Sequence, residues 1–186
     1  MAGKLCAVLI VFLCLTAAAA GATPAPSRMV LQFSDLPSGF AQDFSHHVSA
    51  TLARKENGGW LSPGFQTGWE AQYSRQAITG ILRISSLAGV YATVSAAHNS
   101  LTKGYERVKR ERKLKRLSVG SPLGNEARMY SYTATSAGYR IIVYAVVWRD
   151  GRVKAGVIAA GILGTVDPTQ IVRLARKQHA RILAVS

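Results

Sequence analysis

The most constraining feature of the sequence is the apolar stretch 138–164, GYRIIVYAVVWRDGRVKAGVIAAGILG, which Asp150-Gly151 divides into two halves. Asp-Gly between two apolar runs predicts a β-hairpin, because a type I′ turn needs positive φ at both central residues. With Asp150-Gly151 as the two-residue loop, we expect Trp148 to lie opposite Val153, and Tyr144 opposite Val157. The other segments of the chain must then pair with this hairpin or cover it.

Side chains alternate between the two faces of a strand, so a period of two sorts the hairpin into two faces. One face carries Ile142, Tyr144, Val146, Trp148, Val153, Ala155, Val157 and Ala159. The other face is apolar in the middle and turns polar near the tip, at Arg149, Arg152 and Lys154. Because neither face alternates to polar residues along its middle, we expect both to be covered, at least in part. Small residues such as Gly156 and Ala159 favour close approach of a helix; the alternative is a ligand cleft.

Residues 1–22 have the composition of a signal peptide, with one lysine, an uninterrupted apolar run and a small-residue end. We expect cleavage after Ala22, with an uncleaved membrane anchor as the alternative. Residues 23–28 form a spacer before a single domain at 29–186. Both cysteines, Cys6 and Cys14, lie in the leader, so the mature chain would have no disulfide, no disulfide-linked partner and no cysteine-ligated metal. These features predict a protein that is secreted, periplasmic or held in a cell envelope.

Two further segments have the apolar spacing of helices. Phe44, Val48 and Leu52 recur every four residues and predict a helix over 41–55. A longer stripe at three- and four-residue steps predicts a helix over 88–112.

The last helix has the clearest boundaries. Asp167 suits the N-cap, Pro168 suits N1, and Gln170 at N3 completes a capping-box-like pair. Its inner face is expected to carry Ile171, Leu174, Ala175, Gln178 and Ile182.

Strand patterns over 72–86 and 126–135 add to the two strands of the hairpin. The sequence therefore predicts an α+β domain with a mainly antiparallel sheet of about four strands, including a three-strand meander, covered by two or three helices. We expect the two later helices to share one face of the sheet. The N-terminal helix and the aromatic stretch 59–73 are the candidates for covering the other.

The stretch 59–73, GWLSPGFQTGWEAQY, is rich in glycine and aromatic residues and predicts a loop. Exposed on a loop, Trp60, Phe65 and Trp69 would suit stacking on a glycan or on a small apolar ligand. The alternative is that these side chains close an open edge of the core.

The segment 103–116, KGYERVKRERKLKR, carries eight basic and two acidic residues. Together with a formal net charge of +14 for the whole chain, it predicts attraction to polyanions such as anionic lipid or a wall polymer, with no specific nucleic acid implied. The alternative is a solvated helix face, supported by i,i+4 ion pairs. The candidate polyanion contacts are Lys103, Arg107, Lys109, Arg110, Arg112, Lys113, Lys115, Arg116, Arg173, Arg176, Lys177 and Arg181.

Motifs for catalysis and metal binding are not evident. The four histidines show no metal-ligand spacing, and there is no Gly-x-Ser-x-Gly motif. We therefore expect no catalytic residue, no metal, no cofactor and no enzymatic activity.

Three short motifs carry a resemblance to other proteins. They are the DLPSGF start at 35–40, the VWRDG hairpin tip at 147–151 and the LARKQ segment at 174–178. Together they resemble a group of uncharacterised secreted bacterial proteins with a D-L-P-x-G-F-like start and a V-x-[FW]-R-x-G hairpin. The element order is also similar to compact α+β sheets of the Mog1/PsbP-like kind. The resemblance implies an exported binding or accessory module of a bacterial envelope and brings no catalytic residue; the alternative function is a glycan or small-ligand binder that uses 59–73.

Overall fold

The computed structural model describes residues 25–55, 63–136 and 138–185, so the expected leader and its cleavage site lie outside the described residues. The strands are β1 (Ala41–Ser49), β2 (Phe65–Ser74), β3 (Ile81–Tyr91), β4 (Lys115–Leu117), β5 (Glu126–Ser136), β6 (Tyr139–Asp150) and β7 (Val153–Ile162). The helices are α1 (Ala50–Lys55), α2 (Val94–Glu111) and α3 (Pro168–Leu183), with single 3-10 turns η1 (Pro26–Arg28) and η2 (Phe33–Asp35).

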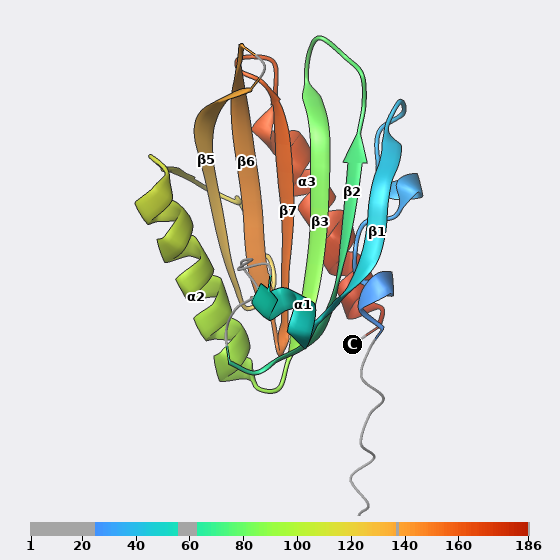
Figure 1. Ribbon diagram of the computed structural model, residues 1–186, viewed down its shortest axis with the longest axis vertical. Helices are drawn as coiled ribbons and strands as arrows, with labels where there is room; N and C mark the ends of the chain where they lie inside the picture. The colour runs from blue at the N-terminus through green and yellow to red at the C-terminus, as the bar shows by residue number, and fades with distance from the viewer. Residues whose placement is uncertain (1–24, 56–62, 137, 186) are drawn as a thin grey trace, which may run out of the picture.

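The strands form one antiparallel sheet in the order β1-β2-β3-β7-β6-β5-β4. The α+β class, the antiparallel pairing and the β5-β6-β7 meander are as expected, but the expected sheet of about four strands is wrong, because the sheet has seven. Helix α2 lies in front of the sheet and α3 behind it (Figure 1). The expectation that both helices share one face is therefore wrong.

The expected helix over 41–55 is wrong for most of its length, because Ala41–Ser49 is the edge strand β1 and only Ala50–Lys55 is helical. Phe44 and Val48 are four residues apart, and that spacing fits both a helix stripe and one face of a strand. Pairing with β2 along the whole of β1 decides in favour of the strand.

The aromatic stretch is also a strand in its second half, because β2 starts at Phe65. The expected strand over 72–86 is divided by the turn 75–80, which joins β2 to β3. Glycine and proline near residues 58–68 favour a loop locally, but pairing with β1 on one side and β3 on the other overrides that preference.

The hairpin forms as expected, with a register that differs by two residues. Asp150 lies opposite Val153, so the loop is Gly151-Arg152, and Trp148 lies opposite Ala155. Gly151 has φ +52°, which supplies the positive φ that the turn needs. A shift of two preserves both faces, because side chains alternate with a period of two.

A tertiary contact from outside the hairpin holds this turn. The Asn125 side-chain oxygen accepts hydrogen bonds from the Gly151 backbone N–H at 2.7 Å and from the Arg149 guanidinium at 3.1 Å. The sequence of the hairpin alone does not reveal this contact with Asn125, and for that reason the expected loop Asp150-Gly151 differs by one position from the observed loop Gly151-Arg152.

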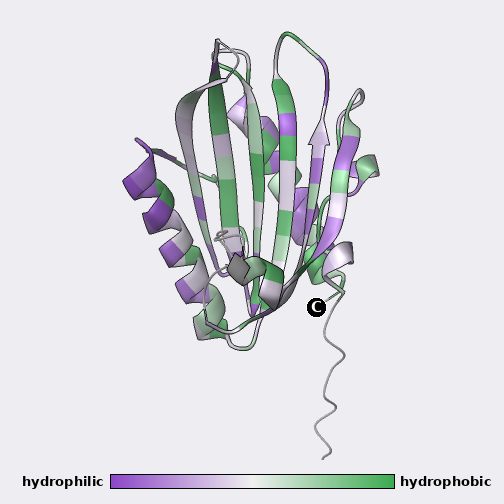
Figure 2. Cartoon of the chain, in the orientation of Figure 1, coloured by the Kyte–Doolittle hydropathy of each residue, from purple (hydrophilic) through white to green (hydrophobic). Residues whose placement is uncertain are grey.

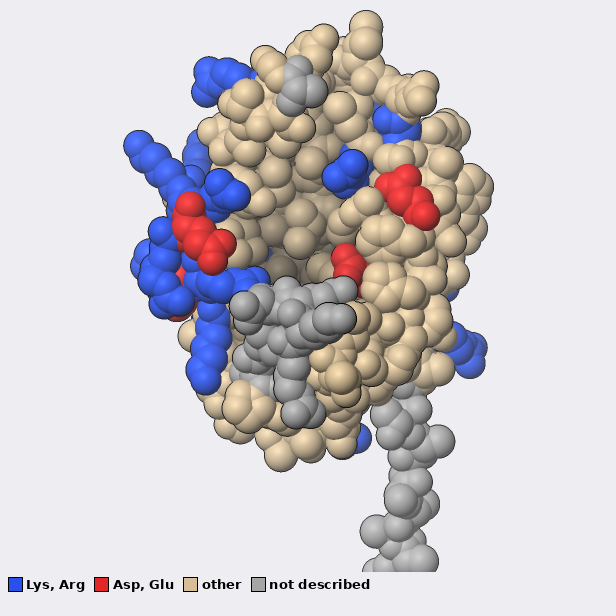
Figure 3. Space-filling view, viewed as in Figure 1, with Lys and Arg blue, Asp and Glu red and all other residues tan. Residues whose placement is uncertain are grey.

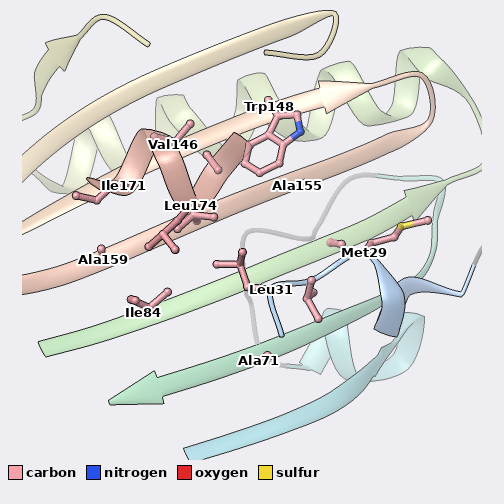
Figure 4. Close-up of a cluster of buried hydrophobic side chains, with 14 of the residues drawn as sticks. Met29, Leu31, Ala71, Ile84, Val146, Trp148, Ala155, Ala159, Ile171 and Leu174 are labelled. Atoms are coloured by element: carbon pink, nitrogen blue, oxygen red, sulfur yellow. The ribbon is translucent and has the colours of Figure 1, made fainter. Parts of the chain in front are cut away.

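The main core lies between the sheet and α3 (Figure 4). Trp148 is fully buried there beside the inner face of α3, which is Ile171, Leu174, Ala175, Gln178 and Ile182 as expected. The N-cap is confirmed too, since the Asp167 carboxylate accepts a hydrogen bond from the Thr169 backbone N–H at 2.9 Å. Met29 and Leu31, just after the spacer, fill the same core. Burying each large apolar side chain here stabilises the fold by roughly 1.5–3 kcal/mol.

The opposite face is covered less completely. Most of β6 is hydrophobic, whereas the C-terminal part of α2 is hydrophilic (Figure 2). Helix α2 buries Ala97, Ser100 and Leu101 against the sheet, all within its first half. No helix among the described residues is long and apolar enough to cross a membrane.

Candidate functional site

The front face of the sheet is hollowed beside α2 (Figure 3). This hollow has a volume of about 320 Å³, within the range of small-molecule sites. Leu87, Val147 and Ile158 form an apolar floor and remain only half-buried. The full lining is Glu70, Leu87, Leu101, Gly104, Tyr105, Arg107, Val108, Tyr130, Val147, Lys154, Ala155, Gly156 and Ile158.

Two glycines provide the room for this hollow. Gly104 lies within α2, where glycine costs about 1 kcal/mol relative to alanine. Gly156 lies in the floor, where an added Cβ would meet Val147 Cγ1 at 3.1 Å and Leu87 Cδ1 at 3.9 Å. Larger side chains at these positions would fill the space between the helix and the sheet.

Aromatic contacts hold the outer part of α2 against β5. The Tyr105 and Tyr130 rings meet edge to face at 5.6 Å between centroids. The Arg128 guanidinium lies 4.9 Å from the centre of the Tyr105 ring and donates to the Thr102 hydroxyl at 3.1 Å. Tyr105 and Tyr130 line one wall of the hollow, and the contacts of this group fix how far α2 lies from the sheet.

A buried polar network holds the other end of α2. The Tyr91 and Ser100 hydroxyls are 2.7 Å apart, and Ser100 is 2 % exposed. The Lys154 ammonium donates to the Ser100 hydroxyl at 3.0 Å and to its carbonyl at 3.3 Å. The network joins β3, α2 and β7, and it places Lys154 under the helix rather than at the exposed hairpin tip.

The charges of the hollow come from three lining residues, Glu70, Arg107 and Lys154. Burial, together with a smaller effect of the nearby positive charge of Arg107, lowers the pKa of Lys154 to about 8. Lys154 and Arg107 therefore bring two cationic groups close together in a mainly apolar site.

Elsewhere on the same face, Glu126 joins the hairpin to α2. Its carboxylate accepts from Arg149 Nε at 2.6 Å and lies 2.8 Å from His98 Nδ1. Burial raises the pKa of Glu126, but the hydrogen bonds from Arg149 and His98 outweigh it and hold the pKa below its usual value. Arg149 is therefore a structural residue rather than a free cation at the tip.

The structure does not bring the predicted aromatic residues together. Phe65 packs with Val48 and Leu87 on the front face, whereas Trp69 packs against the main core. The register shifts between Phe65 and Thr67, and this bulge reverses which face Phe65 points to. Trp69 also donates to the Ser45 hydroxyl at 2.7 Å. Trp60 lies outside the described residues.

The predicted basic residues divide into two groups, one along α2 and the β4 edge and the other on α3. The first group, on α2 and the segment through β4, contains Lys103, Arg107, Lys109, Arg110, Arg112, Lys113, Lys115 and Arg116, and all except Arg107 are exposed. The second group, on α3, contains Arg173, Arg176, Lys177 and Arg181.

Contacts within the chain engage the α3 group. Lys177 donates to the Asp35 carbonyl at 2.6 Å, and Arg181 Nε donates to the Asp35 carboxylate at 2.6 Å. Arg176 donates to the Ser121 carbonyl at 3.0 Å. These cations attach the loops 32–36 and 118–124 to α3, so Asp35 of the DLPSGF motif is a structural anchor.

Sequence reasoning missed the hollow and the residues that define it. The sequence does mark Lys154 as unusual, since it is the one charged residue in the apolar stretch 153–162. Assigning it a role required knowing that α2 crosses this face. Within the described ranges, no three His, Cys, Asp or Glu side chains gather in a way that would hold a metal ion.

No family model matches the sequence, and no curated protein matches it. Among solved structures, the fold is similar to the extracellular domain of PknH from Mycobacterium tuberculosis, with a TM-score of 0.47 and 9 % sequence identity. The alignment covers 86 % of this chain and 100 % of that chain. A likeness at this level carries no functional argument, and the resemblance based on short motifs stays a prediction.

Proposed function

We propose that the protein is an exported, non-enzymatic binding domain whose hollow takes a small molecule with an apolar body and one anionic group. The observation that carries this proposal is the placement of Lys154 and Arg107 in an otherwise mainly apolar hollow of about 320 Å³. Among the described residues of the aromatic stretch 59–73, Glu70 lines the hollow, whereas Phe65 and Trp69 lie on opposite faces of the sheet and do not act together as a stacking surface.

Apolar contact would supply most of the affinity. A ligand that buries about 200 Å² of apolar surface gains roughly 5 kcal/mol before the costs of association. Its anionic group would lie near Lys154 and Arg107, where the low local polarity strengthens the attraction. Glu70 lines the hollow as well and disfavours a second negative charge. The ligand class is therefore an amphipathic monoanion, such as a carboxylate with a short hydrocarbon body.

The test uses anilinonaphthalene sulfonate, a fluorescent probe with an aromatic body and one sulfonate. We expect saturable enhancement of its fluorescence and competition by a medium-chain fatty acid, with much weaker competition by the alcohol of equal length. Gly104→Phe should fill the hollow and abolish binding. Gly104→Ala is the matched control, because it restores helix propensity while adding only one carbon atom.

The charge requirement has its own variant. Lys154→Met should lower the affinity for the fatty acid at least about tenfold and leave the affinity for the alcohol unchanged. Equal competition by acid and alcohol, or undiminished binding to a folded Gly104→Phe protein, would contradict the proposal. Because Lys154 loses its proton near pH 8 in the free protein, affinity for the acid should fall as the pH rises above that value.

A further inference from the structure

The exposed cations of α2 and the segment leading into β4 form a feature that the hollow does not explain. We call these seven residues the basic ridge: Lys103, Lys109, Arg110, Arg112, Lys113, Lys115 and Arg116. The ridge lies along one side of the molecule, where blue side chains gather in Figure 3. Six of the seven fall within 109–116, where Glu111 is the acidic residue.

Internal contacts engage only part of this charge. Lys109 lies 3.8 Å from Glu106, and Arg112 lies 5.9 Å from the centre of the Tyr132 ring, both at the protein surface. Surface ion pairs of this kind contribute about 1 kcal/mol or less to the stability of the fold. By contrast, Lys177 and Arg181 of α3 are held by Asp35. The ridge is therefore where the positive charge of the chain faces solvent most densely.

The shape of the ridge favours a flexible partner over a flat one. Lys115 and Arg116 are successive residues of β4, so their side chains point to opposite faces of the sheet. β4 is also the last strand of the sheet, so both faces of this edge are accessible from outside. A planar bilayer cannot contact both side chains at once, whereas a flexible chain can bend around the edge.

The distribution of exposed hydrophobic side chains also favours a flexible polyanion over a membrane. Across 25–55, 63–136 and 138–185, the large hydrophobic side chains that are exposed lie outside 103–117. The ridge thus offers charge to a partner without side chains that would insert into lipid. Partners recognised by such a surface are those with closely repeated negative charges, held by long-range attraction and release of counterions.

We propose that the basic ridge binds a flexible linear polyanion by wrapping it around the β4 edge. The partner has repeated phosphate, sulfate or carboxylate groups along one chain. A single phosphate ion binds poorly, because the ridge cations are spread along an exposed edge and do not converge on one point. This surface is separate from the hollow, and binding there is independent of the small ligand proposed above.

The test titrates the protein with inorganic polyphosphate at several salt concentrations. The ridge variant is Lys113→Gln/Lys115→Gln/Arg116→Gln. The matched control is Arg83→Gln/Arg140→Gln/Arg152→Gln, which removes the same charge from exposed positions outside the ridge. We expect the ridge variant to lose at least about tenfold in affinity and about two units of slope in log K against log salt, and the control to lose much less.

Each other outcome overturns the proposal. Equal losses in the two variants would mean that net charge alone attracts the polymer. Unchanged polyphosphate binding in a ridge variant that aggregates would assign these cations to protection of the β4 edge against pairing with other strands. Tighter, ridge-dependent binding to phosphatidylglycerol vesicles than to polyphosphate would assign the surface to a membrane. Circular dichroism spectra checked for all variants separate each result from misfolding.

Discussion

At the scale of single residues, Ser100 connects α2 to the sheet. Its buried hydroxyl meets both Tyr91 and Lys154, so Ser100→Ala removes two contacts from the interior. We expect this change to lower the free energy of unfolding by about 1–3 kcal/mol, because buried polar groups lose a partner. Ser95→Ala, an exposed serine on the same helix, should stay within about 0.5 kcal/mol of wild type. Urea denaturation of the two variants measures the difference, and equal losses would contradict the role of Ser100.

Lys154 should give the protein an unusual alkaline pH profile. Its pKa is about 8 in the folded protein against an ordinary value of 10.5, so between these values the unfolded chain binds a proton that the folded protein has released. Stability therefore rises with pH from about 8 to about 10, by up to roughly 3 kcal/mol. Above about pH 10 the trend reverses, because burial raises the pKa of Tyr91 and Tyr130 to about 12. The contribution of these two tyrosines to the free energy of unfolding is complete below pH 10 and is lost as the pH rises through 12.

Lys154→Met isolates the first of these effects. We expect the variant to lose the rise between pH 8 and 10 and to keep the fall above pH 10. Unfolding free energies from urea titrations at successive pH values test this. A wild-type protein whose stability is flat from pH 8 to 10 would show that Lys154 is not buried as a destabilised cation.

At the scale of elements, α3 holds the N-terminal segment through Asp35. The Asp35 carboxylate accepts from Arg181 at 2.6 Å and from the Gln32 backbone N–H at 2.8 Å, which fixes η2 beside the helix. Asp35→Asn should lower stability by about 1–2 kcal/mol and speed amide exchange at 29–33. Glu111→Gln makes the same charge change at an exposed position of α2 and serves as the control. Unchanged exchange in Asp35→Asn would mean that buried Met29 and Leu31 hold the segment without the ion pair.

The elements differ in how well the sequence predicts them, and the reasons are local. Asp167 and Pro168 mark the start of α3, because the first suits the N-cap and the second suits N1. The apolar residues of α3 recur at three- and four-residue steps and fit only a helix. Phe44 and Val48 in β1 are compatible with a helix or a strand, and only pairing with β2 decides between them. β4 is three residues long, too short for any period to emerge, and it exists because β5 offers an edge to pair with.

At the scale of the whole molecule, the hollow results from how two helices divide the sheet. Helix α3 and residues 29–31 pack into the main core on one face, while α2 buries residues against the other face only along its first half. The small residues of β7 lie on both faces, since Ala159 packs in the main core on the α3 side and Gly156 lines the hollow. The period of two placed Ala155 and Ala159 together on one face, but the sequence could not show which helix covers each face, because that required the position of α2.

The most direct test of the central claim is a crystal of the protein soaked with a medium-chain fatty acid that carries a terminal bromine. Anomalous scattering then locates the bromine independently of any assumed pose. We predict one strong peak in the hollow, with the carboxylate within hydrogen-bond distance of Lys154 or Arg107 and no peak in Gly104→Phe crystals. A peak on another surface, or the same peak in Gly104→Phe, would contradict the assignment of the hollow as the ligand site.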